Sequence, residues 1–354
     1  MKLLLKLLVA LAVGAVCVFL VLRDIDLHAT ARALEAVSVP VVGIYLVVLA
    51  ITHLLRSWRW AYLLRPIGVT LPWRQLLVIS SIGFMAIQAL PVRLGEFVRP
   101  YFVVRTGQSR MSAVLGTVAV ERVVDGLLIS IIFFCTYLAS HGSGWSPRLA
   151  AAAWISLLLF VTALLFLAGA LRWPEPTIRL SLALLLLPWL APRLAAKLRD
   201  KLRALIQGFQ VLHEPRNLLP FIFQSVLYWG TNGLGMWLLA QGMGLHVSPG
   251  AAYAAMSFTG VLISLPNSPG LVGQFHLGVV AALGAYLPDS VAARSSALAY
   301  ATLLHGIQLL WYTVLGLACL PFAPGTHSLR EAVVESNRAA EEMETGPSAG
   351  GPRS

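Results

Sequence analysis

The sequence predicts an all-α, polytopic integral membrane protein with about eight transmembrane helices, one or two re-entrant hairpins and a possible inverted repeat. Hydrophobic residues make up 58% of its 354 residues and charged residues only 12%, and the mean hydropathy is +0.79. A soluble domain averages roughly 45–50% apolar and about 25% charged residues. The composition therefore excludes an ordinary soluble domain. We attribute the net charge of +11 to Arg and Lys kept on the cytoplasmic side, and we expect no nucleic-acid partner.

The first apolar segment begins at the N-terminus, where Lys2 and Lys6 precede a run that continues through Leu22. A cleaved signal peptide would have a shorter apolar core, so we expect an uncleaved first helix that enters from the cytoplasm. Further segments, each near the ~20 residues of a membrane crossing, cover 41–64, 112–139, 149–171, 217–242, 251–265, 270–287 and 297–320. Residues 1–322 are then one transmembrane domain, and the polar tail at 323–354 is expected to be disordered.

Two shorter apolar stretches, 75–91 and 180–190, are ambiguous, and basic residues decide between the alternatives. One group of arginines follows the second span: Arg56, Arg59, Arg65 and Arg74. Another group follows the 75–91 stretch: Arg93, Arg99, Arg105 and Arg110. The positive-inside bias keeps both groups in the cytoplasm only if 75–91 is one arm of a re-entrant hairpin. By the same rule 180–190 lies at the interface, and both termini are cytoplasmic.

The chain contains a weak internal repeat. SIGFMAIQALPVRLGEF at 81–97 is similar to SFTGVLISLPNSPGLVGQF at 257–275, and three full crossings separate the two copies, which would then enter from opposite sides. Backbone groups freed at helix breaks inside a membrane must be satisfied by protein or water, so paired breaks indicate a central cavity. The alternative is that Leu-Pro and Gly simply recur in membrane helices. The interrupting residues are Pro91, Pro266, Pro269, Gly270 and Gly273.

The strongest functional signal is charge inside apolar sequence. Arg93, Glu96 and Arg99 follow one another at a spacing of three, and Glu121, Arg122 and Asp125 lie in the first half of the 112–139 span. A charge in hydrocarbon costs about 2.5 kcal/mol or more, and the planar fork of arginine suits a phosphate group. Two interpretations remain open: an anion site for a phosphate head group, and a salt-bridge network that fixes the hairpin to the long helix.

Other polar residues give weaker signals. We interpret the cluster Arg56, Trp58, Arg59, Trp60 and Tyr62 as an interfacial aromatic belt with snorkelling arginines. Asn267 and Ser268 are candidates for hydrogen bonding at the tip of the second break, and Gln274 for lining a cavity. The cysteines Cys17, Cys135 and Cys319 have no metal-ligand spacing, so we expect neither a metal nor a cofactor.

The chain resembles the lysylphosphatidylglycerol synthase transmembrane-region family, within the flippase-like domain superfamily, over roughly residues 5–320. The resemblance rests on RSWRWAYLL, LPVRLGEFVRPYFVVR, VAVERVVDGL and LPNSPGLVGQFHLG. It implies a protein of the bacterial inner membrane that moves or binds a lipid with a phosphate-containing head group. It also implies that the matching polar residues contact this substrate: Arg93, Glu96, Arg99, Glu121, Arg122 and Asp125, then Pro266, Pro269, Gly270 and Gln274.

Our leading functional hypothesis is a lipid translocase or lipid-binding transport protein for a phospholipid or aminoacyl-phospholipid. The alternative is a membrane enzyme or accessory factor for a lipid-linked (polyprenyl-phosphate) substrate, with Glu96 or Asp125 as general base. A third interpretation is a structural subunit, and a homo-oligomer is compatible with each. Only about 30 polar residues follow the last span, too few for the aminoacyl-transfer domain of the synthases. We find no catalytic motif, and we expect no lipid synthesis by this chain alone.

Overall fold

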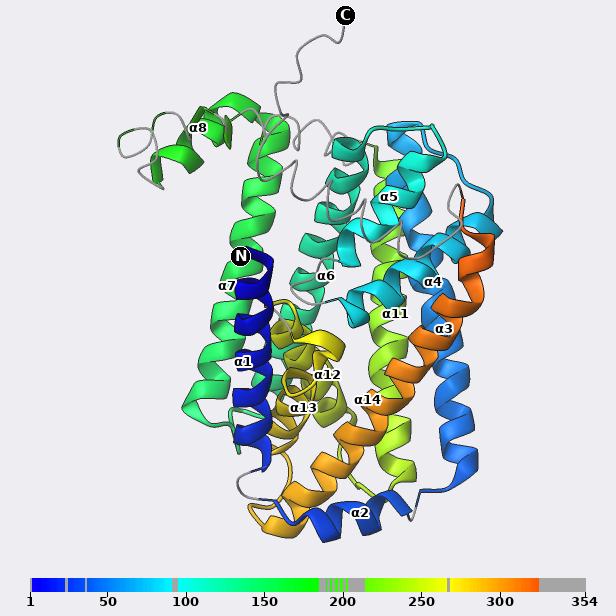
Figure 1. The fold of residues 1–354 in the computed structure, drawn as a ribbon. Coiled ribbons are helices and arrows are strands. Elements are labelled where there is room, and N and C mark those ends of the chain that lie inside the picture. The colour runs from blue at the N-terminus through cyan, green and yellow to red at the C-terminus, as the bar shows by residue number, and fades with distance from the viewer. Residues whose placement is uncertain are drawn as a thin grey trace, which may run out of the picture.

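The computed structural model describes residues 2–22, 25–35, 37–90, 95–184, 214–265 and 268–324, with isolated positions between 189 and 202, and the side chains from Leu11 onward except Val13. All regular structure in these ranges is helical (Figure 1). The expected disordered tail lies almost entirely outside the described residues.

Six long helices form the bundle: α1 (Lys2–Leu22), α3 (Val39–Leu64), α6 (Met111–Ala139), α7 (Pro147–Arg172), α11 (Pro215–Gly242) and α14 (Val291–Cys319). At 1.5 Å per residue, the five helices from α3 onward are each about 40 Å long, which exceeds the ~30 Å hydrocarbon core of a bilayer. Three described segments meet both the length and the hydropathy of a membrane span: Val39–Ile67, Pro147–Arg172 and Val291–Phe322. The membrane class is confirmed, whereas the count of eight stays a prediction.

Small residues bring α3 and α11 close together. A Cβ atom added at Gly235 would lie 2.4 Å from Val48 Cγ1, and one at Gly242 would lie 2.3 Å from Val41 Cγ1. Because the residue number on α11 rises as that on α3 falls, the two helices run antiparallel. Close backbone approach at glycines is the usual way in which membrane helices gain packing contacts.

The segment after α3 forms the first hairpin, as the distribution of arginines predicts. A 3₁₀ helix (η1, Arg65–Ile67) and Gly68, with φ of 78°, turn the chain back into α4 (Trp73–Ala89). The short α5 (Val98–Arg105) then returns to the end at which α6 begins (Figure 1). The two arms approach closely, since a Cβ atom at Gly95 would lie 2.2 Å from the carbonyl carbon of Ala86.

The second hairpin consists of α12 (Pro249–Ile263), the 3₁₀ helix η4 (Pro269–Leu271) and α13 (Gln274–Leu283). We expected 251–265 and 270–287 to approach crossing length. At 15 and 10 residues, both helices are instead too short to cross, and they pack against each other. Short loops join this hairpin to the last turn of α11 and the first turn of α14, so it enters from the end opposite to the first hairpin (Figure 1).

The two hairpins meet inside the bundle, where η4 contacts α4. Their opposite entry is the geometry that the internal repeat predicts. We call the end at which α3 ends and α6 begins the basic end, because it carries Arg65, Arg74, Arg105, Arg110 and Arg172. The short α8 (Pro174–Leu184) also lies at the basic end (Figure 1).

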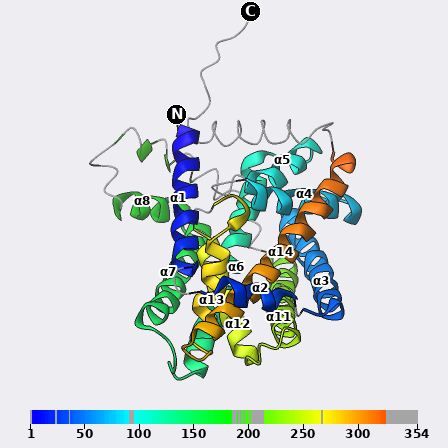
Figure 2. The same cartoon turned by 60° about the horizontal axis from the view of Figure 1, so that its bottom comes forward.

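The opposite end, which we call the far end, is covered by α2 (Leu27–Glu35). This helix packs across α14 (Figure 2). Asp26 begins α2: its Oδ1 accepts hydrogen bonds from the N–H groups of Ala29 and His28, and these bonds lower the pKa of its carboxyl group. Thr30 and the backbone N–H of Asp26 bond to Ser295 at the start of α14.

Candidate functional site

A buried ion network joins α3, α5 and α6. Glu121 of α6 accepts hydrogen bonds from Arg59 Nη2 (3.1 Å), Arg99 Nη1 (2.9 Å) and Arg122 Nη2 (3.0 Å). Asp125, one helical turn further along α6, accepts from both Nη atoms of Arg59 at 2.6 and 2.7 Å, and lies 3.2 Å from Arg122 Nη2. The spacing of four residues places both carboxylates on one face of α6, toward α3.

Arg59 lies at the centre of this network, and our expectation that it snorkels within an interfacial belt is wrong. The residue is 0% exposed. Its guanidinium makes a bidentate contact with Asp125, and Nη1 also donates to Ser225 Oγ of α11 at 2.9 Å. Two carboxylates on one face of an apolar helix require cationic partners, so the sequence signals that such a partner exists but not that it is Arg59.

Arg99 reaches Glu121 through a slot in α4. A Cβ atom at Gly83 would lie 2.0 Å from Arg99 Cγ, so the glycine leaves the space in which this side chain runs. The guanidinium carbon of Arg99 lies 4.0 Å from the centroid of the Trp60 ring, a cation–π distance. Arg99 therefore ties the first hairpin to α6, which is the salt-bridge role that the sequence left open.

The network is almost fully desolvated, with Glu121 at 0%, Arg99 at 1% and Asp125 at 5% exposure. Trp229 Nε1 of α11 donates a further hydrogen bond of 3.0 Å to Asp125 Oδ1. Buried ion pairs offset their desolvation cost only when their hydrogen bonds are well satisfied, and removal of one partner typically costs about 3–5 kcal/mol. The network thus holds three helices in one register.

A cavity of about 440 Å³ lies beside the network, between the tips of the two hairpins. Polar side chains from four long helices and both hairpins line it: Arg56, Gln88, Glu96, Arg122, Asp125, Asn232, Thr259, Ser264 and Gln308. Aromatic side chains form much of the remaining wall: Phe84, Phe160, Tyr228, Trp229, Phe275 and Tyr312. A concave, mostly apolar site with a few convergent polar groups is typical of a ligand site.

Arg122 and Arg56 present cationic groups to this cavity. The Arg122 side chain is 27% exposed, whereas the other members of the network are nearly inaccessible. Arg56 is half-buried, and its guanidinium carbon lies 3.9 Å from the centroid of the Phe84 ring. In and directly behind the cavity, the described residues supply four guanidinium groups (Arg56, Arg59, Arg99, Arg122) and three carboxylates (Glu96, Glu121, Asp125). This part of the site therefore has an excess of positive charge.

The sequence-predicted site residues take up different places. Glu96, Arg122 and Asp125 line the cavity, and Arg99 and Glu121 lie behind it. Arg93, Pro266 and Asn267 lie outside the described residues. Pro269, Gly270 and Gln274 shape the break of the second hairpin, where Gln274 Oε1 accepts from Ser268 N at 3.2 Å, but the residues of this motif that line the cavity are Leu271 and Phe275.

Within the described ranges, no group of three His, Cys, Asp or Glu side chains converges as a metal-binding cluster. The polar groups of the cavity are instead suited to binding an anion through arginine.

Comparison with known proteins supports the family that the motifs suggest. The family model described as the lysylphosphatidylglycerol synthase TM region matches residues 7–316, which include both hairpins and the whole ion network. No curated protein matches the chain. The chain therefore belongs to the family of the lysylphosphatidylglycerol synthase transmembrane region.

Proposed function

We propose that this protein is a lipid translocase or lipid-binding transport protein that receives a phosphate-containing lipid head group in the cavity between the hairpins. The observation that carries the proposal is a cavity, enclosed by two oppositely entering helix breaks, into which Arg122 and Arg56 present guanidinium groups. Membership of a membrane family related to lipid handling is consistent with it.

Arg122 and Arg56 would hold the phosphate, because among the described residues theirs are the guanidinium groups that line the cavity. Arg59, Glu121 and Asp125 would act indirectly: Glu121 and Asp125 hold Arg122 Nη2 at 3.0 and 3.2 Å, and Arg59 in turn forms ion pairs with both carboxylates. Such support keeps the Arg122 guanidinium in one orientation before the ligand arrives, which reduces the cost of binding.

The inverted hairpins suggest how the head group would pass from one side to the other. In many transporters, broken helices in two inverted halves surround a central site, and one half moves against the other. Here α4 and η4 touch at the tips of the two hairpins, so a shift of either hairpin changes the walls of the cavity. We place the basic end in the cytoplasm and the protein in the bacterial inner membrane, following the positive-inside rule.

The alternative is catalysis on a lipid-linked phosphate, which requires a carboxylate that can take up a proton. Asp125 is poorly suited, because both of its oxygens already accept hydrogen bonds from Arg59. Glu96 is then the carboxylate of the cavity that this alternative would use.

Purified protein in proteoliposomes, supplied with a fluorescent phosphatidylglycerol, tests the proposal. Dithionite bleaching from outside measures the rate at which labelled lipid crosses the bilayer. We expect Arg122→Gln and Arg56→Gln to lower the protein-dependent rate at least tenfold. Arg172→Gln, at an exposed position at the end of α7, is the matched control and should retain the wild-type rate.

Rates that stay at the wild-type level in both cavity variants, in protein with an unchanged melting temperature, would overturn the assignment of the phosphate site. Conversion of a polyprenyl phosphate to a new product by the same purified protein, abolished in Glu96→Gln, would favour the enzymatic alternative instead.

A further inference from the structure

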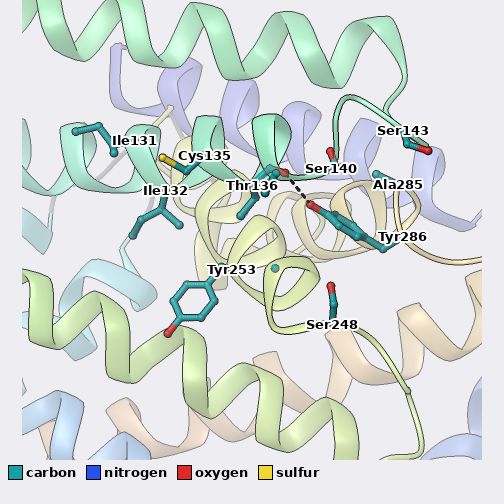
Figure 3. A pocket seen from close by; sticks show the side chains of 12 residues that line it. Ile131, Ile132, Cys135, Thr136, Ser140, Ser143, Ser248, Tyr253, Ala285 and Tyr286 are labelled. Atoms are coloured by element: carbon teal, nitrogen blue, oxygen red, sulfur yellow. Dashed lines mark hydrogen bonds between the residues drawn. The ribbon is translucent and has the colours of Figure 1, made fainter.

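A second pocket, distinct from the charged cavity, lies toward the far end of the bundle. It has a volume of about 700 Å³ and is formed by the last turns of α6, the first turns of α12 and the turn after α13 (Figure 3). Ile132 and Tyr253 line this pocket, whereas Ile129 and Met256, each three residues away on the same helix, line the cavity. The two sites are therefore neighbours along the contact between α6 and α12.

The lining of the second pocket contains no Asp, Glu, Lys, Arg or His among the described residues. Its polar groups are hydroxyls: Thr136, Ser140, Ser143, Ser248, Tyr253 and Tyr286. The remaining wall is largely apolar, with Ile131, Ile132 and Cys135 on α6 (Figure 3). A charged head group would lose its hydration here without gaining a counter-charge, which is unfavourable.

Four of these hydroxyl groups already donate their protons to backbone carbonyls. Thr136 Oγ1 donates to Phe133 O and Ser140 Oγ donates to Tyr137 O, both at 2.7 Å. Tyr253 OH donates to Gly230 O at 2.7 Å, and Tyr286 OH donates to Thr136 O at 3.3 Å (Figure 3 shows the last contact). A hydroxyl whose proton is donated keeps its oxygen lone pairs as acceptors. The pocket therefore presents acceptors to a ligand.

A phosphate group, which itself offers acceptor oxygens, is the wrong partner for such a surface. A ligand with several uncharged O–H donors and an apolar portion satisfies both the oxygen acceptors and the isoleucine wall. We propose that this second pocket binds an uncharged, hydroxyl-bearing lipid of the glycosyl-diacylglycerol class. The site is independent of the phosphate site proposed above.

Cys135 provides a direct probe, because it is exposed and lies in the lining. In a Cys17→Ala, Cys319→Ala background, the rate of Cys135 alkylation by a maleimide reports occupancy. The full-length protein is placed in phosphatidylcholine nanodiscs with added monoglucosyl diacylglycerol, phosphatidylglycerol or diacylglycerol. We expect the glucolipid to slow alkylation at least fivefold, and the other two lipids to slow it less than twofold.

Two variants test the role of the hydroxyl oxygens. Thr136→Val and Tyr286→Phe remove an acceptor each while keeping the volume of the side chain, and each should reduce the protection by glucolipid severalfold. Arg122→Gln, in the cavity, should leave that protection unchanged. The proposal for this pocket and the proposal for the phosphate site can therefore be refuted independently. Equal protection by phosphatidylglycerol, no protection by glucolipid, or full protection in both hydroxyl variants would each overturn the proposal.

Discussion

The two re-entrant hairpins share a geometry but not a chemistry. Both arms of the first hairpin carry charge, whereas α12, η4 and α13 contain no Asp, Glu, Lys or Arg. The first is tied to the bundle by Arg99, which pairs with Glu121 on α6. The second is held by apolar packing, in a core cluster that includes Phe258, Phe275 and Val279.

A shared shape with different contacts shows that the hairpin depends on backbone approach rather than on a particular motif. In each hairpin a glycine on one arm lies against the backbone of the other arm: Gly95 against Ala86, and Gly278 against Thr259. In the first hairpin, the ion pair of Arg99 with Glu121 adds a second attachment to the bundle, which α12, η4 and α13 lack because they carry no Asp, Glu, Lys or Arg. Substitutions that remove a charge, and others that block the close backbone approach at a glycine, test the two contributions separately.

The largest effect is expected from Glu121→Leu, which should affect the two hairpins unequally. The free energy of unfolding should fall by about 3–5 kcal/mol, because the substitution leaves Arg99 without the carboxylate that it contacts among the described residues. Amide exchange should accelerate in α5 and stay nearly unchanged in α12 and α13. Detergent unfolding followed by tryptophan fluorescence, with hydrogen–deuterium exchange, measures both quantities.

The control for this variant is Glu214→Gln, at an exposed carboxylate before α11, which should change stability by less than about 0.5 kcal/mol. Equal acceleration of exchange in the two hairpins would contradict the idea that they are held by different forces.

Gly95→Ala and Gly278→Ala should each lower the free energy of unfolding by less than Glu121→Leu does, and by similar amounts. The added Cβ atoms would lie 2.2 Å from the Ala86 carbonyl carbon and 2.7 Å from Thr259 Cα, so backbone must shift in both cases. Overpacking of this kind costs about 1–3 kcal/mol. The same unfolding assay measures it, with Gly43→Ala as the control because a Cβ atom there meets nothing within 4 Å. If Gly95→Ala and Gly278→Ala were tolerated as well as Gly43→Ala, close backbone approach would not be the common basis of the two hairpins.

The smallest effect is expected from Gly270→Ala, which tests the break of the second hairpin alone. Gly270 has φ of 68°, and the nearest atom to an added Cβ is Val272 Cγ2 at 3.6 Å, so the cost is conformational rather than steric. A left-handed conformation costs an L-residue roughly 1–2 kcal/mol. Gly306→Ala, in the middle of α14, is the control in the same unfolding assay. A stabilised Gly270→Ala protein would show that this backbone conformation is not required.

Much of this arrangement could be predicted from particular residues. The apolar segment 41–64 corresponds to α3 at Val39–Leu64, and the arginines on either side of 75–91 correctly indicated a hairpin. The pairing of Arg59 could not be predicted in the same way, because Glu121 and Asp125 are 62 and 66 residues away in the chain. Similarly, the sequence predicted that Gln274 lines the cavity. In the structure Leu271 and Phe275 line it instead, because the backbone turns at Gly270 and Gly273.

The sequence by itself determined the membrane class, the helical segments and the opposite entry of the hairpins, because hydropathy, charge asymmetry and helix breaks are properties of local chain segments. Only the tertiary structure decided which arginines are buried in the ion network and which face the cavity. The physical reason is that each arginine could pair with carboxylates on several helices. The packing of α3, α5 and α6 determines which of these groups lie close enough to pair. The same packing leaves Arg122 and Arg56 accessible to a ligand.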